Sequence, residues 1–588
     1  MKINRRRFIF GSVLVGGGAL FTYSATRPSR HRQANVDLAQ GEERYITSFI
    51  KIEPGNEITI YVPHSEMGQG IHTSLSMMAA DELDANWEEV NIEQAPAIDL
   101  FANGDLVRGF ASEFGVPDFL MGLVGASAFA VAEIGNLQTT GGSSSVRFTG
   151  EHGMRVAGAA AREMLIESAA VRWDVPVEEL STKLSHVHHN TTGRSFSYGQ
   201  LAADAARKEP PENPRLKGRS QFNIMGKAIS RNDIPAKVDG SAMYGMDAHS
   251  DDMLYAAIRM APVFGTKLIS ANSQPAFSVP GVQDVIVLED SVAVVADNYW
   301  HAKKALELIE TEWEASENDS VSSADIATRF DRELANSNGS KDKEVGDADA
   351  ALRSAADYIE ASYRVPYLAH ACMEPMNAVA SVVGDSCEIW TGSQNPLGFR
   401  YDVAAALDLD PENVSFHNYF MGGGFGRRSV SDVAVQAAQI SRQAGLPVKL
   451  IWSREEDTRQ DYYRPAVMSE FHASLDQHNR PVSWENIYVD KHEPAEAPHI
   501  PYAIANQKIH FVDSPTHVPF GPWRSVDHSQ HGFFTESFVD ELAYEAAQDP
   551  YQFRRDMLGG HPRLLAALDL VAEKSQWNVP IGKGRGRG

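Results

Sequence analysis

Cysteine is nearly absent from this sequence: Cys372 and Cys387 are the only two among 588 residues. Two thiolates are too few for even one iron–sulfur cluster of the type held by four cysteines. The sequence therefore predicts no iron–sulfur cluster on this chain, so any redox relay that serves it must lie on another polypeptide. A disulfide between the two cysteines would need an oxidising compartment, and their spacing alone does not establish one.

Positive charge is also scarce, because 53 Lys and Arg stand against 78 Asp and Glu, for a formal net charge of -25. This balance argues against nucleic acid as a partner, since phosphate binding depends on clustered Lys and Arg. An acidic surface favours solubility instead. Hydrophobic residues make up 43% and charged residues 22% of the chain, as in folded globular proteins. The length exceeds what one core normally supports, so we expect several domains.

The apolar stretch from Gly11 to Tyr23 is shorter than the roughly 20 residues that a membrane-spanning helix needs. It follows the basic start Arg5-Arg6-Arg7, and this combination predicts a signal peptide for twin-arginine export to the periplasm. That route carries proteins that are already folded, often around a cofactor. No clear small-x-small cleavage site follows, so the segment could remain as an inner-membrane anchor. The alternative is a basic start beside a short buried helix.

The rest of the chain reads as an α+β multidomain protein. Ile58 to Val62 alternates like a strand, Thr73 to Asp84 has helical spacing, and a proline-rich run at 210–214 indicates a linker. Short strands at Val285–Leu288 and Val292–Val295, with a helix at Ala302–Thr311, predict a small α+β module. The expected divisions are a signal peptide and spacer at 1–44, an α/β region at 45–215, the small module at 216–315, an acidic linker at 316–355 and a second α/β region at 356–588.

Glycine-rich loops are the feature that points to ligand binding. Gly141 to Ser145 precedes a helical pattern from Met154 to Ala170, and Gly422 to Arg428 precedes another that runs to about Ala444. Such loops let backbone N–H groups approach an anionic ligand, and the dipole of the following helix adds attraction. For a single loop of this kind, a tight turn that requires positive φ is the better explanation.

The order of several motifs along the chain favours ligand binding over a simple turn. In chain order they are Glu66-Met67-Gly68-Gln69-Gly70, Thr140-Gly141-Gly142-Ser143, Ile234-Pro235-Ala236-Lys237-Val238-Asp239-Gly240, His370-Ala371-Cys372-Met373-Glu374-Pro375, Gln394-Asn395-Pro396 and the loop Gly422 to Arg428. This set resembles the xanthine dehydrogenase and aldehyde oxidase superfamily of molybdenum hydroxylases, and within it the isoquinoline 1-oxidoreductase β-subunit type. The resemblance runs from about residue 45 to the end of the sequence.

The resemblance implies two molybdopterin-binding α/β regions that flank a small hammerhead domain. Gln394 matches a glutamine that contacts the metal's oxo ligand, and Arg524 matches an arginine beside the metal, so these two are the expected catalytic residues. The metal itself would be held by the pterin and by no side chain. The implied cofactor is molybdenum–molybdopterin in its cytosine dinucleotide form. Its expected contacts on this chain, besides Gln394 and Arg524, are Gln69, Gly70, Gly141, Gly142, Ser143, Gly423, Gly424, Phe425, Gly426 and Arg427. The loops around Gln69, Gln394 and Gly424 should then converge.

Two positions bear on the substrate. Ser429 stands where xanthine dehydrogenases have a purine-contacting glutamate, which argues against xanthine. Arg464 matches an arginine that faces substrate in those enzymes, although a surface arginine is an equally good reading. The implied reaction is oxidation of an N-heteroaromatic or an aldehyde, with water as the source of oxygen. The implied partners are a small subunit with two [2Fe-2S] clusters, a cytochrome c as electron acceptor and the small-molecule substrate.

The family's chemistry uses a general-base glutamate from a late Gly-x-Gly-Glu motif, and no such motif occurs before Gly588. Related subunits continue further. The expectation is therefore a gene model that is cut short, a remainder on a separate chain, or a product that is inactive by itself. Two alternatives stay open: a subunit that binds cofactor without turnover, and an exported ligand-binding protein without molybdenum.

Overall fold

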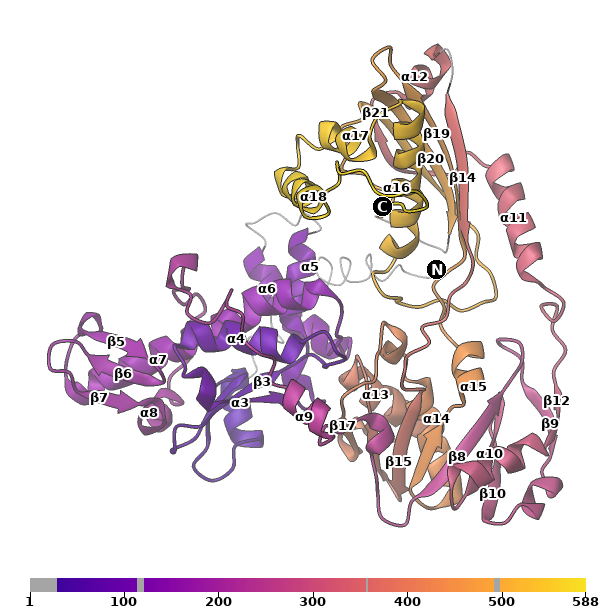
Figure 1. Cartoon of the computed structure of the whole chain (residues 1–588). Helices are drawn as coiled ribbons and strands as arrows, with labels where there is room; N and C mark the ends of the chain where they lie inside the picture. The colour runs from indigo at the N-terminus through magenta and orange to yellow at the C-terminus, as the bar shows by residue number, and fades with distance from the viewer. Residues whose placement is uncertain (1–28, 114–120, 356–357, 491–496) are drawn as a thin grey trace. The chain divides into compact units, whose positions relative to one another are not determined.

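A computed structural model describes residues 29–113, 121–355, 358–490 and 497–588. The expected twin-arginine segment lies outside these residues. Within the described ranges, no helix combines the length and apolar character needed to cross a membrane. The chain divides into two compact units (Figure 1), which are described separately. Among the described residues, unit 1 comprises 29–113, 121–261, 267–313 and 371–460, and unit 2 comprises 262–266, 314–355, 358–370, 461–490 and 497–588.

The first part of unit 1 is a four-stranded sheet covered by helices. Its strands run in the order β1 (Arg44–Thr47), β2 (Ile50–Ile52), β3 (Ile58–Val62) and β4 (Val90–Gln94), with β3 and β4 parallel. The helices of this part are α3 (Arg30–Asp37), α4 (Ile71–Leu83), α5 (Gly104–Glu113), α6 (Met121–Ile134), the π-helix η4 (Ser145–Met154), which continues into α7 (Arg155–Trp173), and α8 (Tyr198–Ala205). A small sheet of β5 (Leu180–Lys183), β6 (His186–His189) and β7 (Ser195–Ser197) adjoins α8.

The second part of unit 1 is a seven-stranded sheet drawn from two distant stretches of chain. The strand order is β10 (Val282–Val287), β11 (Ser291–Ala296), β8 (Leu254–Met260), β18 (Val448–Ile451), β15 (Asn377–Val383), β16 (Ser386–Thr391) and β17 (Val414–Asn418). Three strands of the expected small module thus share one sheet with strands from 377–451. Its other elements are the pair β9 (Leu268–Asn272) and β12 (Glu310–Trp313), and helices α9 (Ile234–Asp239), α10 (Tyr299–Glu307), α13 (Pro396–Leu407), α14 (Asp432–Ala444) and α15 (Arg454–Arg459).

Unit 2 is built on a five-stranded sheet. The order is β13 (Ser340–Val345), β21 (Asn506–Asp513), β20 (Pro481–Asp490), β19 (Val467–Leu475) and β14 (Ile359–Val365). Its helices are α11 (Ser323–Asn336), α12 (Ala348–Ser354), α16 (His528–Glu545), α17 (Pro550–Met557) and α18 (Pro562–Lys574). Aromatic side chains dominate the core between the sheet and α16, where Phe471, Trp484 and Phe538 contact one another.

Regular structure occupies much of the expected acidic linker at 316–355, which the sequence predicts to contain one amphipathic helix. This stretch contains α11, α12 and the edge strand β13, which pairs antiparallel with β21. Ile326, Phe330 and Leu334 recur at four-residue spacing on α11 and are all buried. Because one apolar face is enough to anchor a helix, the polar composition of the stretch reflects its solvent-facing side and not a loose connection.

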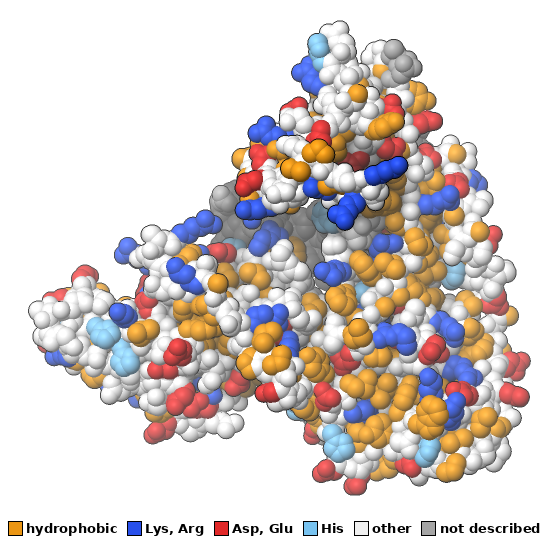
Figure 2. Space-filling model, viewed as in Figure 1, with side chains coloured by type: hydrophobic (Ala, Val, Ile, Leu, Met, Phe, Trp, Pro, Cys, Tyr) orange, Lys and Arg blue, Asp and Glu red, His pale blue; other side chains and the backbone are white. Residues whose placement is uncertain are grey.

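The strand and the helix expected on either side of the Glu66–Gly70 loop are both present. The strand at Ile58–Val62 is β3, and the helix expected from Thr73 to Asp84 is α4. On the face shown in Figure 2, Lys and Arg are interspersed with Asp and Glu and do not gather into a continuous basic patch.

Candidate functional site

Gln394 joins three segments of unit 1. It follows β16 and is 4% exposed. Its Nε2 donates to the carbonyl of Thr140 at 3.1 Å, and its Oε1 accepts the N–H of Gly426 at 2.8 Å. Its backbone carbonyl accepts the N–H of Thr140 at 2.7 Å, and its N–H donates to the carbonyl of Arg428 at 2.8 Å. The side-chain amide therefore fixes the Thr140 loop and the glycine loop against each other.

The glycine loop has a left-handed backbone at several positions and leaves no room for a side chain at Gly424. Gly423, Phe425 and Gly426 all have positive φ, at 98°, 53° and 112°. A Cβ on Gly424 would lie 2.6 Å from Oε1 of Gln394 and 2.9 Å from Sδ of Met67. The loop therefore passes close to both neighbouring segments, and this close approach requires glycine.

Arg428 and Glu374 hold the glycine loop from behind, and sequence reasoning assigned a role to neither. The buried guanidinium of Arg428 donates from Nε to the carbonyl of Gly423 at 3.0 Å and lies 3.2 Å from Oε2 of Glu374. The same carboxylate accepts the N–H of Gly422 at 2.7 Å. Nη1 of Arg428 is buried and has no hydrogen-bond partner among the described residues, so one strong donor beside the loop is left over.

Arg427, one of the expected cofactor contacts, has a buried side chain that pairs within unit 1. Its guanidinium makes a two-pronged ion pair with Asp432, at 2.7 and 3.1 Å, and lies 5.2 Å from the ring centre of Trp452. The side chain is 1% exposed. These contacts fasten the start of α14 to the loop.

The loop from Glu66 to Gly70 is held in place by the carboxylate of Glu66. Glu66 is buried, and its Oε1 accepts the N–H groups of Gly68 and Gly70 at 2.9 and 3.0 Å. Its Oε2 accepts the N–H of His72 at 3.3 Å. The amide of Gln69 folds back onto the loop, donating to Ser65 and accepting from the N–H of Met67. Gly68 and Gln69 are nevertheless exposed at the surface.

Residues 231–237 clamp this loop from the outside. Nη1 of Arg231 donates to the carbonyl of Gly68 at 2.8 Å, and its Nη2 lies 3.2 Å from Oε1 of Glu66. Asp233 pairs with both Arg231 and Lys237 at 2.5 Å. Burial alone would raise the pKa of Asp233, but these two ion pairs outweigh burial and lower that pKa.

The Gly141–Ser143 loop presents backbone at the start of a continuous helical stretch. The N–H of Gly141 donates to Oγ of Ser145 at 3.1 Å, while Gly142 and Ser143 are exposed. No atom lies within 4 Å of where a Cβ on Gly142 would stand. Because η4 and α7 follow directly, the partial positive charge of the helix terminus favours an anion here.

The segments expected to converge do so within unit 1. Met67 touches the glycine loop at Gly424, Gln394 bonds to Gly426, and Oγ1 of Thr140 accepts the N–H of Ser65 at 2.7 Å. Ser429 lies at the end of the same loop, where its N–H donates to the carbonyl of Gly426 at 3.1 Å. The individual roles of these residues toward a cofactor or substrate stay predictions.

Arg464 and Arg524 belong to unit 2. Arg464 is 9% exposed, donates from Nη2 to the carbonyl of Pro366 at 2.9 Å and lies 5.8 Å from the ring centre of Trp523. Burial lowers its pKa. Arg524 is exposed in a turn whose next two residues, Ser525 and Val526, have positive φ. Their expected roles also stay predictions.

The two cysteines are free and buried, so no disulfide joins them. Sγ of Cys372 lies 3.4 Å from the carbonyl oxygen of Gly424, next to the glycine loop. Burial raises the pKa of Cys387 to about 12. Across the described part of the chain, no three or more His, Cys, Asp or Glu side chains come together as a metal-binding group.

These features fit a large anionic cofactor held mainly by backbone. The glycine loop cannot accept a Cβ at Gly424, the helix terminus at Gly142 faces open space, and a guanidinium donor of Arg428 is left over. A metal carried by an organic ligand needs no side-chain metal site. The residues of unit 1 are thus compatible with the metal–pterin cofactor that the resemblance implies.

Comparison with known proteins identifies the class to which this arrangement belongs. A family model described as the molybdopterin cofactor-binding domain matches residues 331–558. The isoquinoline 1-oxidoreductase β-subunit of Brevundimonas diminuta is 30% identical over 90% of this chain and 72% of the relative. The chain belongs to the family of molybdopterin-binding large subunits of molybdenum hydroxylases.

Other relatives are named for different activities. The membrane-bound aldehyde dehydrogenase [pyrroloquinoline-quinone] of Gluconacetobacter polyoxogenes is 28% identical, with 96% of this chain and 73% of the relative covered. A nicotinate dehydrogenase subunit of Pseudomonas putida is 24% identical, and the match covers 91% of this chain but 44% of the relative. The solved aldehyde oxidoreductase of Desulfovibrio desulfuricans ATCC 27774 has a similar fold, with a TM-score of 0.50 at 17% identity. That match covers 86% of this chain and 57% of the solved one.

Proposed function

We propose that this chain is the cofactor-binding, catalytic subunit of a molybdenum hydroxylase that oxidises an N-heteroaromatic or an aldehyde with water as the source of oxygen. The observation that carries the proposal is the junction at Gln394, whose amide holds both the glycine loop and the Thr140 loop. Three loops that are far apart in sequence meet there, as a shared ligand would require.

The chain's own residues would bind and orient the cofactor. Gly424 to Gly426 and the amide of Gln394 would lie along the pterin and its metal, while the N–H groups after Gly141 would hold the phosphates of a cytosine dinucleotide tail. Gln69 and Gly70 would border the same cofactor. When bound, the cofactor supplies a two-electron oxidation of an sp² carbon. The side chains supply position and electrostatics.

The substrate class rests on relatives and on one residue. The matched relatives are named for isoquinoline, nicotinate and aldehydes, which all offer an sp² carbon for oxidation. Ser429 provides no carboxylate of the kind that contacts a purine, which argues against xanthine. Arg464 and Arg524 would serve as the substrate-facing and metal-adjacent arginines.

A small subunit with two [2Fe-2S] clusters would accept the electrons and pass them to a cytochrome c, because this chain has only two cysteines.

Export by the twin-arginine route would place the complex in the periplasm. Replacing Arg5 and Arg6 by lysine should leave the protein in the cytoplasm, since the export receptor recognises guanidinium groups and not charge alone. Unchanged periplasmic delivery would contradict the export proposal.

The deciding experiment measures metal and pterin in protein purified from a host that makes the cofactor. About one molybdenum and one pterin per chain are expected, with oxidation of N-heteroaromatics or aldehydes when the partner is present. Gln394→Ala should lose most of the molybdenum while remaining folded. Gln283→Ala, at an exposed position on β10, is the matched control and should keep it. Wild-type protein that is folded but free of molybdenum would support the ligand-binding alternative instead.

A further inference from the structure

Two loops of unit 2 that carry the expected arginines meet on one short segment. The segment is 366–370, which follows β14, and the loops are 461–464 and 519–524. Arg464 and Leu368 exchange two backbone hydrogen bonds, at 3.0 and 3.2 Å, so the first loop pairs with the segment like a short strand.

The two loops also contact each other. The N–H of Tyr463 donates to the carbonyl of Pro519, and its carbonyl accepts the N–H of Gly521, both at 3.2 Å. The guanidinium of Arg464 lies 5.8 Å from the ring centre of Trp523. The backbone next to one arginine is therefore fixed against the backbone that leads to the other.

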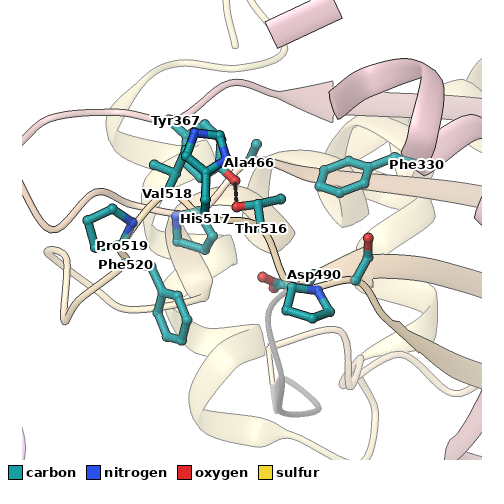
Figure 3. Close-up of a pocket in the computed structure, with 12 residues that line it drawn as sticks. Phe330, Tyr367, Ala466, Asp490, Thr516, His517, Val518, Pro519 and Phe520 are labelled. Carbon is teal, nitrogen blue, oxygen red and sulfur yellow. Dashed lines mark hydrogen bonds between the residues drawn. The ribbon is translucent and has the colours of Figure 1, made fainter. Parts of the chain in front are cut away.

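Tyr367 anchors the segment on its other side. The stretch 514–520, which leads into the second loop, lines a cavity of about 240 Å³ together with Tyr367 (Figure 3). The hydroxyl of Tyr367 is bonded to Oγ1 of Thr516 at 2.5 Å, and its ring centre lies 6.1 Å from that of Tyr463. These contacts hold the segment in place three residues before His370.

His370 is bonded to both loops through its two ring nitrogens. Nδ1 lies 2.8 Å from Oδ1 of Asp461, at the start of the first loop. Nε2 lies 2.9 Å from the carbonyl oxygen of Pro522, on the second loop. The side chains of His370 and Asp461 are each 1% exposed, so both ring nitrogens depend on the protein for their hydrogen bonds.

These two acceptors require two ring protons. A carbonyl oxygen can only accept, so Nε2 donates to Pro522. Both oxygens of Asp461 already accept backbone N–H groups, Oδ1 from Tyr462 at 2.7 Å and Oδ2 from His370 at 2.5 Å. Because such bonds stabilise a charged carboxylate, the proton between Asp461 and Nδ1 belongs to the ring. A ring that donates from both nitrogens is an imidazolium.

We propose that His370, as an imidazolium, is the positioning residue that holds the loops of Arg464 and Arg524 together, with one ring proton bonded to each loop. What the two arginines do rests on the proposed function, whereas the contacts that hold them do not. A ring without the Nε2 proton would turn a lone pair toward the carbonyl of Pro522 and release the loop that carries Arg524. A ring without the Nδ1 proton would leave the buried carboxylate of Asp461 without the opposite charge of the imidazolium.

Nuclear magnetic resonance of the full chain, labelled with ¹⁵N-histidine, tests the protonation directly. The signals of His370 are those that disappear in His370→Gln. Both of its ring nitrogens are expected to carry protons at about pH 7.5, whereas solvent-exposed histidines ordinarily lose the second proton near about pH 6.5. A bare ring nitrogen in His370 at that pH would overturn the proposal.

Two amide replacements separate the contacts to the two loops, because the amide of Asn can donate in place of Nδ1 and that of Gln in place of Nε2. His370→Asn should accelerate hydrogen exchange at Gly521 and Val526 at least tenfold and leave Tyr462 within about threefold. His370→Gln should do the reverse. His478→Asn, at an exposed position after β19, is the control and should change none of them. Equal acceleration at all three amides in both variants would show a packing role only and overturn the assignment.

Turnover of the loaded complex gives the functional readout. His370→Asn should lower kcat at least tenfold at unchanged molybdenum content, because the loop of Arg524 is released, and His370→Gln should lower it less. An unchanged kcat in His370→Asn would refute the positioning role. If the wild-type protein held no molybdenum, the proposed function would fail, while the spectra and the exchange pattern would still decide the role of His370.

Discussion

Gly424 is the residue at which the candidate cofactor site tolerates change least. The space that a Cβ would need is occupied by Oε1 of Gln394 and Sδ of Met67, which lie 2.6 and 2.9 Å from the ideal Cβ position. Both neighbours are side-chain atoms, so a methyl group would displace them without breaking the backbone of the unit. The effect should therefore be local to the site.

Gly424→Ala is expected to lower molybdenum content at least fivefold, because the displaced amide of Gln394 no longer holds Gly426 and Thr140. The loss of stability should be about 1–3 kcal/mol, typical for a disturbed buried hydrogen bond. Gly532→Ala is the control, since no atom lies within 4 Å of its added Cβ in α16. Chemical denaturation and elemental analysis of both variants give the answer, and equal metal content in the two would refute the argument.

The buried carboxyl of Asp105 should make the free energy of unfolding depend on pH. Burial raises the pKa of this α5 carboxyl to about 6, although Arg30 and Arg108 act in the opposite direction. A folded pKa above the unfolded value of about 3.9 means that the stabilising contribution is complete below pH 4 and is lost as the pH rises through 6. Asp105→Asn should flatten the fall in unfolding free energy between about pH 4 and 6, which amounts to no more than about 3 kcal/mol. The slope is the readout, and an unchanged slope would contradict the assignment.

At the scale of elements, the start of α4 is stabilised by an anion that the chain itself provides. Glu66 accepts the N–H groups of Gly68, Gly70 and His72, so these donors are already used. Helix termini commonly leave such groups to caps or ligands. Compared with the start of α4, the backbone after Gly141 is therefore more open to a ligand.

Glu66→Ala should release this loop without unfolding unit 1. Amide hydrogen exchange at Gly68 and Gly70 is expected to accelerate by at least tenfold, and the unfolding free energy to fall by about 1–3 kcal/mol. Glu57→Ala, an exposed carboxylate next to β3, is the control. Protection at Gly68 and Gly70 that survives Glu66→Ala would show that Arg231 alone holds the loop.

Local patterns in the sequence identify elements but not their partners. The alternation at Ile58–Val62 and the helical spacing after Gly70 predicted β3 and α4, because each pattern is set by neighbours in sequence. The pairing of β8 with β18 is parallel and long-range, so no local signal contains it. Glu374 and Arg428 lie within the motifs, but their roles were not predicted for a related reason: a charged residue shows its burial only when its distant partner is known. Gln394 was found through the motif set, not through periodicity.

At the scale of the whole chain, the two units have separate cores. Leu165 belongs to the core of the first sheet of unit 1, and Phe538 to the core beneath α16 in unit 2; neither core contains residues of the other. In differential scanning calorimetry, a core mutation in one unit should therefore lower the unfolding transition of that unit and leave the transition of the other unit unchanged. Phe538→Ala should cost about 3–5 kcal/mol and Leu165→Ala about 2–5 kcal/mol, each lowering a different transition. A single transition lowered by both would refute independent unfolding.

Assembly of the seven-stranded sheet depends on the order in which its strands leave the ribosome. β8 is made early, but its partner β18 follows only after the stretch 314–370 of unit 2 has been made. At roughly 5–20 residues per second, one edge of β8 waits on the order of 10–40 s for β18. Over that interval a nascent chain exposes an apolar strand edge of the kind that promotes aggregation. Gln394 and the glycine loop emerge within the same late stretch, so a ligand of that junction meets a chain whose central sheet is only then closing.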